Sequence, residues 1–304
     1  MLFRRNGDSL AVHTPAKLNL FLEVLGKRSD GYHELETLMV SIDIYDTLVF
    51  AGDASNEIRL RCVNASQYVG GRADDSGDDI PDGPGNLVWQ AASLLRTHTG
   101  VQRGVRIDVH KRIPIAAGLG GGSSNAAATL VALNRLWKLN LSQAELLGLA
   151  CQLGSDVPFF LAGAPAAVCR GRGEQIEPVR MSLGLHFVVV RPATGLSTAL
   201  VFRQCQPAQQ FKSVRNLTDS LERGRLGCAA GSLHNALQQP AEQLNAEVRQ
   251  LRTRFSSLSV LGHAMSGSGT AYFGVCAHRR QARSVAARLR AERMGRVFVA
   301  QCRP

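Results

Sequence analysis

The chain has 304 residues, 45% of them hydrophobic, which is enough for two ordinary domains, or one large one, with an ample core. It contains neither a run of about 18 apolar residues nor a charged and apolar leader with a cleavage site, so we expect no membrane span and a cytoplasmic protein. A net charge of +11 favours anionic partners, and seven scattered cysteines without a Cys-x-x-Cys pair argue against a disulfide frame or a zinc site.

The first part of the chain is predicted to be rich in strands. Short runs of β-branched and apolar residues indicate strands at residues 18–24, 36–44 and 46–50. Five aspartates lie among Gly and Pro in residues 70–85, which predicts a surface loop. A helix is then predicted at residues 86–96, and alternating apolar residues predict a strand at 105–109.

The second part is predicted to interleave helices and strands. Ala126, Leu130, Leu133 and Trp137 mark one face of a helix, and Ser142 is placed to cap the next helix. That helix is predicted at residues 143–153, followed by strands at 186–190, 272–276 and 297–301 and helices at 240–255 and 279–293. Such elements with short connections indicate an α+β second half, with a change of layer near residues 160–175.

Eight arginines lie between residues 279 and 303, with one glutamate to oppose them. Apolar residues recur there at helical spacing, so we expect the arginines to occupy the solvated side of an amphipathic helix. A nucleic-acid-binding surface is the rival interpretation, and it requires an affinity for DNA or RNA that falls steeply with salt. Such surfaces usually interleave aromatic side chains with basic ones, whereas Phe298 is the only aromatic residue in 279–304.

A glycine-rich loop stands out in the sequence. Residues 113–127 read IPIAAGLGGGSSNAA, with four glycines within positions 118–122. Glycines let the backbone adopt positive φ and lie against a ligand with no Cβ in the way. Ser123 and Ser124 then open an Ala-rich segment, which predicts a helix N-terminus with free N–H groups. We interpret this loop as a phosphate cradle, with a purely structural turn as the alternative.

The spacing of this loop differs from that of two other nucleotide-binding loops. A Walker A motif requires a lysine, and none follows Gly122. A dinucleotide fingerprint requires a third glycine at the position of Ser123. It also requires an acidic residue about 20 positions further on, and the sequence has none at that distance. Zinc-hydrolase and α/β-hydrolase motifs do not occur either, so the sequence favours phosphate chemistry.

Two further pairs are candidates for a site. Lys17 and Asn19 are two residues apart on a predicted strand and so share one face, which for such residues is most often the solvated face. Tyr32 and His33 follow the turn signal Ser-Asp-Gly and are predicted at a loop tip or strand start. There they could hold a nucleobase, or be ordinary turn aromatics.

Two more positions leave alternatives open. Asp156 could take part in chemistry, or cap the short segment Val-Pro-Phe-Phe that follows it. Residues 266–269, Ser-Gly-Ser-Gly, could bring backbone N–H groups to the same phosphates or merely join two strands. The residues alone do not decide either case.

In their order along the chain, these pieces resemble the three motifs of the GHMP kinase superfamily, which is named for galactokinase, homoserine kinase, mevalonate kinase and phosphomevalonate kinase. The matching segments are residues 15–20 for motif one, 114–127 for motif two and 265–270 for motif three. Residues 16–22, 28–35, 153–160 and 265–269 look most like the branch that acts on a cytidine diphosphate derivative of methylerythritol. A mevalonate-type kinase is the near alternative, and the pair Tyr32 and His33 separates the two because mevalonate carries no base.

The resemblance implies a two-domain α+β fold with the active site in the cleft between the domains. An N-terminal domain like ribosomal protein S5 domain 2 would span residues 1–163, and a ferredoxin-like α/β-sandwich domain would span 164–304. It also implies that ATP, accompanied by Mg²⁺, donates its γ-phosphoryl group to the 2-hydroxyl of the acceptor, in the non-mevalonate isoprenoid route. The partners would then be small molecules, with no nucleic acid or membrane, and the protein a monomer or weak homodimer.

The resemblance further implies a set of site residues. Asp156 would orient or deprotonate the attacking hydroxyl, and Lys17 would stabilise charge on the transferred group. The acceptor would contact Asn19, Tyr32, His33, Thr198 and Phe202. The nucleotide phosphates would lie against Pro114, Ala116, Gly118, Leu119, Gly120, Gly121, Gly122, Ser123, Ser124, Gly267 and Ser268. The resemblance names no metal ligands.

Overall fold

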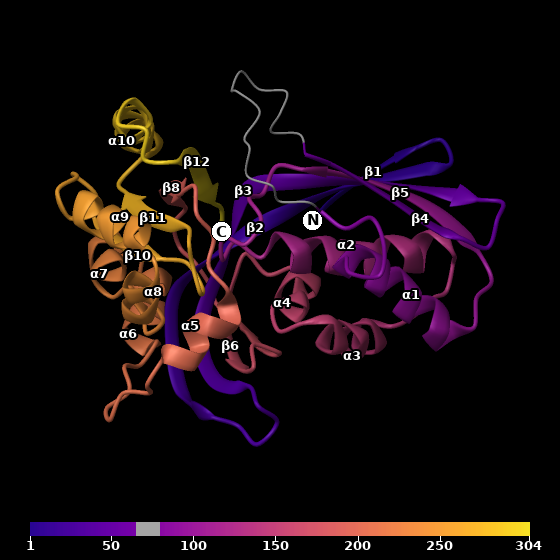
Figure 1. Ribbon diagram of the computed structural model, residues 1–304, viewed down its shortest axis with the longest axis horizontal. Coiled ribbons are helices and arrows are strands. Elements are labelled where there is room, and N and C mark those ends of the chain that lie inside the picture. The colour runs from indigo at the N-terminus through magenta and orange to yellow at the C-terminus, as the bar shows by residue number, and fades with distance from the viewer. Residues whose placement is uncertain (65–79) are drawn as a thin grey trace. The chain divides into compact units, whose positions relative to one another are not determined.

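A computed structural model describes residues 1–64 and 80–304, which form two compact units (Figure 1). The first unit comprises Met1–Ala16, Ile44–Ile115 and Gly120–Gly163. The second comprises Lys17–Asp43, Ala116–Leu119 and Ala164–Pro304. Most of the predicted surface loop at 70–85, residues 70–79, lies outside the described residues. Within the described residues, no helix combines the length and apolar character that a membrane crossing requires.

The first unit contains a sheet built from strands of both orientations. β1 (Leu2–Asn6) pairs antiparallel with the start of β2 (Ser9–Lys27), and the end of β3 (His33–Asp53) pairs antiparallel with β5 (Gly104–Lys111). β5 also pairs with β4 (Ile58–Asn64), in parallel. The two strands predicted at 36–44 and 46–50 are one continuous strand, because the alternation of buried and part-exposed side chains in β3 continues through Tyr45.

The helices described in the first unit are α1 (Leu87–Thr99), α2 (Gly121–Leu136), α3 (Gln143–Leu153) and α4 (Val157–Ala162). Asn86 caps α1 by accepting a hydrogen bond of 2.9 Å from the Val88 N–H. The predicted cap Ser142 is confirmed, and it forms a reciprocal capping box with Glu145 at the start of α3.

The second unit contains an antiparallel sheet in the order β10 (Gly262–Met265), β11 (Tyr272–Cys276), β8 (Leu185–Arg191) and β12 (Arg296–Cys302). β6 (Ala166–Gly171) pairs with β3 and with β7 (Gln175–Pro178), and the two-residue strand β9 (His234–Asn235) pairs in parallel with β2. The strands predicted at 186–190, 272–276 and 297–301 are therefore confirmed.

The helices described in the second unit are α5 (Thr198–Gln204), α6 (Arg215–Glu222), α7 (Leu226–Gly231), α8 (Gln238–Leu244), α9 (Ala246–Ser256) and α10 (Arg279–Ala291). The prediction of one helix at 240–255 is wrong. Asn245 has extended backbone angles, φ −141° and ψ 114°, and its side chain accepts hydrogen bonds from the N–H groups of Glu247 and Val248. An asparagine that caps a new helix in this way ends the preceding one.

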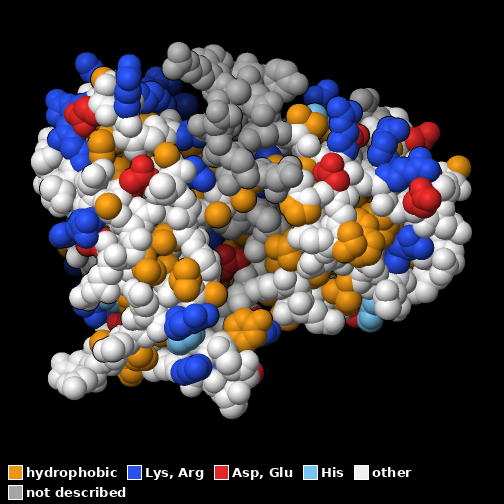
Figure 2. All heavy atoms as spheres, viewed as in Figure 1, with side chains coloured by type: hydrophobic (Ala, Val, Ile, Leu, Met, Phe, Trp, Pro, Cys, Tyr) orange, Lys and Arg blue, Asp and Glu red, His pale blue; other side chains and the backbone are white. Residues whose placement is uncertain are grey.

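The arginine-rich segment behaves as predicted. In α10 the residues Ala282, Val285, Ala286 and Leu289 are buried, whereas its arginines are exposed. Figure 2 shows basic side chains gathered over this helix. The segment is thus an amphipathic helix packed on the second unit, with a solvated basic face.

Candidate active site

Lys17 and Asn19 are buried in the second unit, with side chains 3% and 2% exposed. The expectation that they face solvent is wrong, because Leu18 and Leu20 are buried as well, so β2 is covered on both faces at this point. The Lys17 ammonium donates a hydrogen bond of 2.5 Å to Asn19 Oδ1, and Asn19 Nδ2 donates one of 2.8 Å to the hydroxyl of Thr37. A buried, ordered cation of this kind can neutralise an anionic group that is brought to it.

The turn after β10 packs directly on this pair. The hydroxyl of Ser266 accepts a hydrogen bond of 3.2 Å from the Asn19 N–H and donates one of 2.9 Å to the carbonyl oxygen of Gly118. Gly267 has φ +56°, and a Cβ placed on it would lie 3.2 Å from Lys17 Nζ. Motif one, motif three and the start of the glycine-rich loop are therefore in contact within the second unit.

The position of Gly118 leaves no room for a side chain. It has φ +71°, and a Cβ would lie 2.1 Å from the backbone oxygen of Ser266. Its chain neighbours are held in place too, since Lys17 N–H donates to Leu119 O across 2.9 Å and Ala271 N–H donates to Ala117 O across 3.0 Å. Ala116, which is exposed, adopts a positive φ of 48° at the entry to this segment.

The rest of the loop opens helix α2 in the first unit. Gly120 is its N-cap residue at φ 70° and offers no side-chain cap, so the N–H groups of Gly121, Gly122 and Ser123 have no acceptor within the helix. Gly122 is exposed and Ser123 is half-buried. These groups form the kind of helix N-terminus that binds anions.

Ser124 differs from its neighbour Ser123. It is fully buried, and its hydroxyl donates a hydrogen bond of 2.6 Å to Pro15 O and contacts the hydroxyl of Thr14. In the described arrangement the Ser124 hydroxyl therefore anchors the first turn of α2 to β2.

A buried ion pair supports the entry to the glycine-rich loop. Asp46, at 0% exposure, accepts hydrogen bonds from the Arg112 N–H at 2.6 Å and the Ile113 N–H at 2.9 Å, and pairs with the Lys111 ammonium. A Cβ on Gly121 would lie 3.1 Å from Lys111 Nζ. The pair thus fixes the segment leading to the buried Pro114 and lies under the first residue of α2. Sequence reasoning did not identify it, because its partners are 65 residues apart.

Asp156 occupies the N-cap position of α4 without acting as its cap. Its backbone is helical, with φ −89° and ψ −12°, and its side chain makes no capping hydrogen bond. It is partly exposed, and it belongs to the first unit, as do Gly121 and Ser123. The interpretation of Asp156 as the side-chain cap that begins α4 therefore has no support from the geometry.

A group of rings lies at the start of β3 in the second unit. His33 is the first residue of that strand, and its ring centroid lies 5.0 Å from that of Phe202 on α5. Tyr32 is 52% exposed, and the Arg172 guanidinium lies 4.7 Å from its ring centroid. Burial, and secondarily Lys27, lowers the pKa of His33, so the imidazole is neutral at pH 7. A neutral imidazole presents one donor and one acceptor.

Thr198 connects this group to motif three. It is exposed at the start of α5, and its hydroxyl lies 2.8 Å from the hydroxyl of Ser268. The structure therefore brings together, in one unit, Lys17, Asn19, Gly118, Gly267, Ser268 and Thr198. Thr37 contacts Asn19 and Arg172 contacts Tyr32, and sequence reasoning had singled out neither of them.

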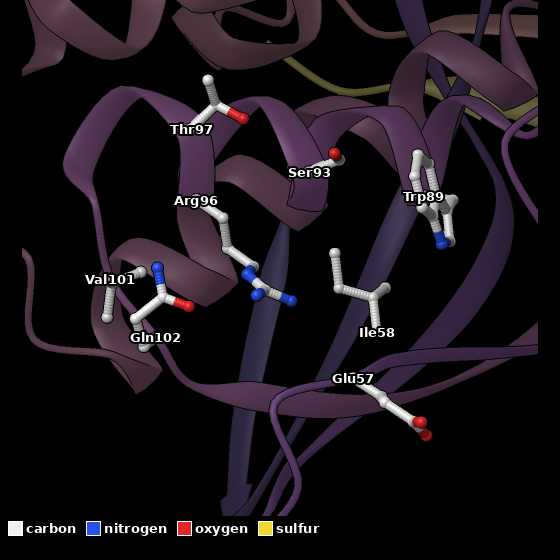
Figure 3. A pocket seen from close by; sticks show the side chains of 8 residues that line it. All are labelled: Glu57, Ile58, Trp89, Ser93, Arg96, Thr97, Val101 and Gln102. Atoms are coloured by element: carbon white, nitrogen blue, oxygen red, sulfur yellow. The ribbon is translucent and has the colours of Figure 1, made fainter.

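A separate pocket of about 470 Å³ lies in the first unit between α1 and β4. Figure 3 shows Arg96 reaching from α1 toward Ile58 of β4, with Trp89 further along the helix. The Arg96 side chain donates a hydrogen bond of 2.7 Å to Asn56 O. None of the residues predicted for the site lines this pocket.

Comparison with known proteins identifies the family of this chain. Residues 86–164 match the N-terminal domain of the GHMP kinases, and residues 214–294 match their C-terminal domain. The 4-diphosphocytidyl-2-C-methyl-D-erythritol kinase of Pelotomaculum thermopropionicum is 43% identical over 90% of this chain and 92% of its own length. This chain belongs to that kinase family. A relative of the same description from Bacillus pumilus is 39% identical over 86% of each chain.

The solved structures give the same result at the level of the fold. A crystal structure described as 4-(cytidine 5'-diphospho)-2C-methyl-D-erythritol kinase has a TM-score of 0.77 and 36% identity, and the alignment covers 96% of this chain and 98% of the other. A homoserine kinase from Cytophaga hutchinsonii, at 16% identity and a TM-score of 0.70, shares the fold over 100% of this chain and 97% of its own. The predicted α+β kinase fold and the family resemblance are confirmed.

Proposed function

We propose that this chain transfers the γ-phosphoryl group of ATP to the 2-hydroxyl of 4-(cytidine 5'-diphospho)-2-C-methyl-D-erythritol, giving the 2-phosphate and ADP in the non-mevalonate isoprenoid route. The observation that carries the proposal is the packing in the second unit. There the buried Lys17 and Asn19 lie against Gly267, in the same unit as the ring pair of His33 and Phe202. The site thus combines phosphate chemistry with groups suited to a nucleobase.

The glycine-rich loop supports the binding of the nucleotide phosphates. The N–H groups of Gly121, Gly122 and Ser123 and the Ser123 hydroxyl would bind phosphate oxygens at the N-terminus of α2. The neighbouring residues Pro114, Ala116, Gly118, Leu119, Gly120 and Ser124 would shape and anchor this loop, and Gly267 and Ser268 would add N–H groups from motif three. Catalysis of phosphoryl transfer rests mainly on such positioning and charge stabilisation.

The part of the chain that the structure describes offers few ligands for Mg²⁺. Within residues 1–64 and 80–304, no group of three or more His, Cys, Asp or Glu side chains could hold a metal ion. Mg²⁺ commonly keeps several waters and is held by one or two carboxylates together with substrate phosphates. The site residues are compatible with this kind of Mg²⁺ binding. Asp156 or the Ser123 hydroxyl would supply one ligand, and the substrate phosphates would supply the other ligands. The ion would neutralise charge on the transferred group.

Asp156 and Lys17 would act on the transferred group. We assign Asp156 the orientation or deprotonation of the attacking hydroxyl, because it has a partly exposed carboxylate that its helix does not use as a cap. Lys17 would stabilise the negative charge on the transferred group. Its hydrogen bond to Asn19 holds the ammonium in one place for this purpose.

The rings at the start of β3 would recognise the cytosine. Tyr32 and Phe202 offer faces on which a base can stack, and neutral His33 can donate to and accept from the base edge. Asn19 and Thr198 would contact the remainder of the acceptor. In sequence terms, residues 1–163 would form the ATP-phosphate domain and 164–304 the second kinase domain, although Lys17–Asp43 and Ala116–Leu119 pack with the second unit. The protein would be a cytoplasmic monomer or weak homodimer with small-molecule partners.

The experiment is a substrate panel. The purified protein is incubated with ATP, Mg²⁺ and, separately, the cytidine diphosphate alcohol, mevalonate and homoserine, while ADP release and product mass are followed. The proposal predicts ADP release and a mass gain of one phosphoryl group with the cytidine acceptor. Equal turnover of mevalonate would refute it.

A further inference from the structure

We propose that Asn235 is a positioning residue for phosphoryl transfer, which holds the motif-three turn in the conformation that directs its N–H groups at phosphate. This inference rests on the function proposed above. Asn235 belongs to β9, where it pairs in parallel with Leu22 of β2, the strand that carries Lys17 and Asn19. It is therefore attached to the same strand as motif one.

The side chain of Asn235 makes three hydrogen bonds. It is 8% exposed, and Nδ2 donates to two carbonyl oxygens of the turn, Met265 O and Gly267 O, each at 2.8 Å. Its Oδ1 accepts a hydrogen bond of 2.9 Å from the Leu237 N–H. Only a side-chain amide offers two donors and an acceptor in this arrangement.

These two bonds set the direction of the peptide groups in the turn. In a trans peptide the C=O and the following N–H point in opposite directions. With Gly267 O held toward Asn235, the Ser268 N–H points away from Asn235. With Met265 O held likewise, the Ser266 N–H points away too, and it donates to Ala271 O across 2.9 Å. Asn235 therefore decides to which side the N–H of Ser268 is presented.

The direction of these peptide groups matters because the turn is packed closely against motif one. Gly267 lies so close to motif one that a Cβ would be 3.2 Å from Lys17 Nζ and 3.3 Å from Asn19 Oδ1. Gln238 supports the same turn by accepting a hydrogen bond of 3.1 Å from the Met265 N–H. The segment from Asn235 to Gln238 thus carries three of the bonds that fix motif three against motif one.

The test is Asn235→Asp. Aspartate keeps the size and the acceptor for Leu237, but replaces the donor with an oxygen that faces two carbonyl oxygens. We expect kcat/KM for ATP to fall on the order of 10- to 100-fold, since small displacements of positioning groups have effects of this size. ADP should bind more weakly by a similar factor, and amide hydrogen exchange in residues 266–269 should become faster.

The matched control is Asn134→Asp. Asn134 also bridges a loop with its amide, donating to Leu141 O and accepting from Leu141 N–H, each at 3.0 Å, and it belongs to the other unit. The Asn134→Asp variant should lower Tm, whereas the affinity for ADP and the amide hydrogen exchange of residues 266–269 should stay unchanged. If Asn235→Asp does not fold, Asn235→Ala, which removes the donors without adding a charge, carries the same expectation.

The outcomes separate this inference from the proposed function. An Asn235 variant that lowers Tm but keeps wild-type ADP affinity and exchange in 266–269 would show a merely structural role and overturn the inference. A wild-type protein that leaves the cytidine acceptor unchanged would refute the proposed function instead. In that case the ADP affinity and the exchange rates still test whether Asn235 fixes motif three.

Discussion

The hydroxyl of Ser266 donates a hydrogen bond to the carbonyl oxygen of Gly118, and a Cβ on Gly118 would lie 2.1 Å from the carbonyl oxygen of Ser266. Motifs two and three, 148 residues apart in sequence, therefore meet backbone against backbone. The glycine is needed for this approach as well as for its positive φ. The loop that begins at Gly118 is thus held by motif three as well as by its own sequence.

Gly118→Ala should lower activity strongly. Its Cβ cannot coexist with the Ser266 oxygen at 2.1 Å, so the loop or the turn must move. A displacement of this kind costs on the order of 10²-fold in kcat/KM. Steady-state kinetics with ATP and the cytidine acceptor measure the loss, and thermal unfolding measures the accompanying drop in Tm.

The control for that variant is Gly148→Ala. Gly148 is exposed inside α3, and a Cβ there would meet nothing within 4 Å. Alanine in an exposed helix interior stabilises by about 0.5–1 kcal/mol relative to glycine. This variant should keep wild-type kinetics. Equal losses in both variants would show that any added methyl group is harmful and would contradict the explanation by close approach.

Asp156→Asn tests the proposed acid–base role. The amide keeps the shape but cannot accept a proton, so kcat should fall on the order of 10²- to 10⁴-fold. The Asp156 side chain makes no capping hydrogen bond to α4, so loss of a helix cap should not contribute to any change in Tm. Kinetics and thermal unfolding on the same sample separate the two effects. A variant with unimpaired kcat would remove Asp156 from the chemistry.

His33→Ala tests recognition of the base. Loss of the ring removes its contact with Phe202 and the hydrogen bond that we propose it makes to the cytosine, which together should raise the KM for the acceptor about 10-fold. The KM for ATP should stay within a factor of about two, because the substitution leaves the phosphate loop intact. Equal increases in both KM values would mean that His33 supports the fold rather than the base.

Much of this site was predictable from local sequence, and the errors have physical causes. The glycine-rich loop and the cap Ser142 were predicted because their signals lie within a few residues. Lys17 and Asn19 were expected to face solvent, because a strand usually has one solvent-exposed face. Nothing in the local sequence shows that β2 is covered on both faces. Asn235 and Asp46 were missed because their bonds reach partners 30 and 65 residues away.

Stability should depend on pH through four half-buried histidines. Burial is the first cause that lowers the pKa values of His33, His186, His234 and His263. The folded protein then binds these protons less readily than the unfolded chain, whose histidines titrate near 6.5. The free energy of unfolding is therefore fully retained above about pH 6.5 and falls as the pH drops toward the lower folded pKa values.

Urea unfolding at pH 8, 7, 6 and 5.5 checks this expectation. The variant His263→Gln, which retains a polar partner for the Tyr272 hydroxyl 2.9 Å away, should lose less stability between pH 7 and 5.5 than the wild type. A stability that stays constant or increases as the pH falls through this interval would contradict the assignment.

The most direct measurement uses ATP labelled in its γ-phosphoryl group together with the cytidine diphosphate alcohol and Mg²⁺. Mass spectrometry and phosphorus NMR of the product then locate the label. We expect one labelled phosphoryl group on the 2-oxygen of the methylerythritol part, with one ADP formed for each product. Label recovered only as inorganic phosphate, with the alcohol unchanged, would contradict it.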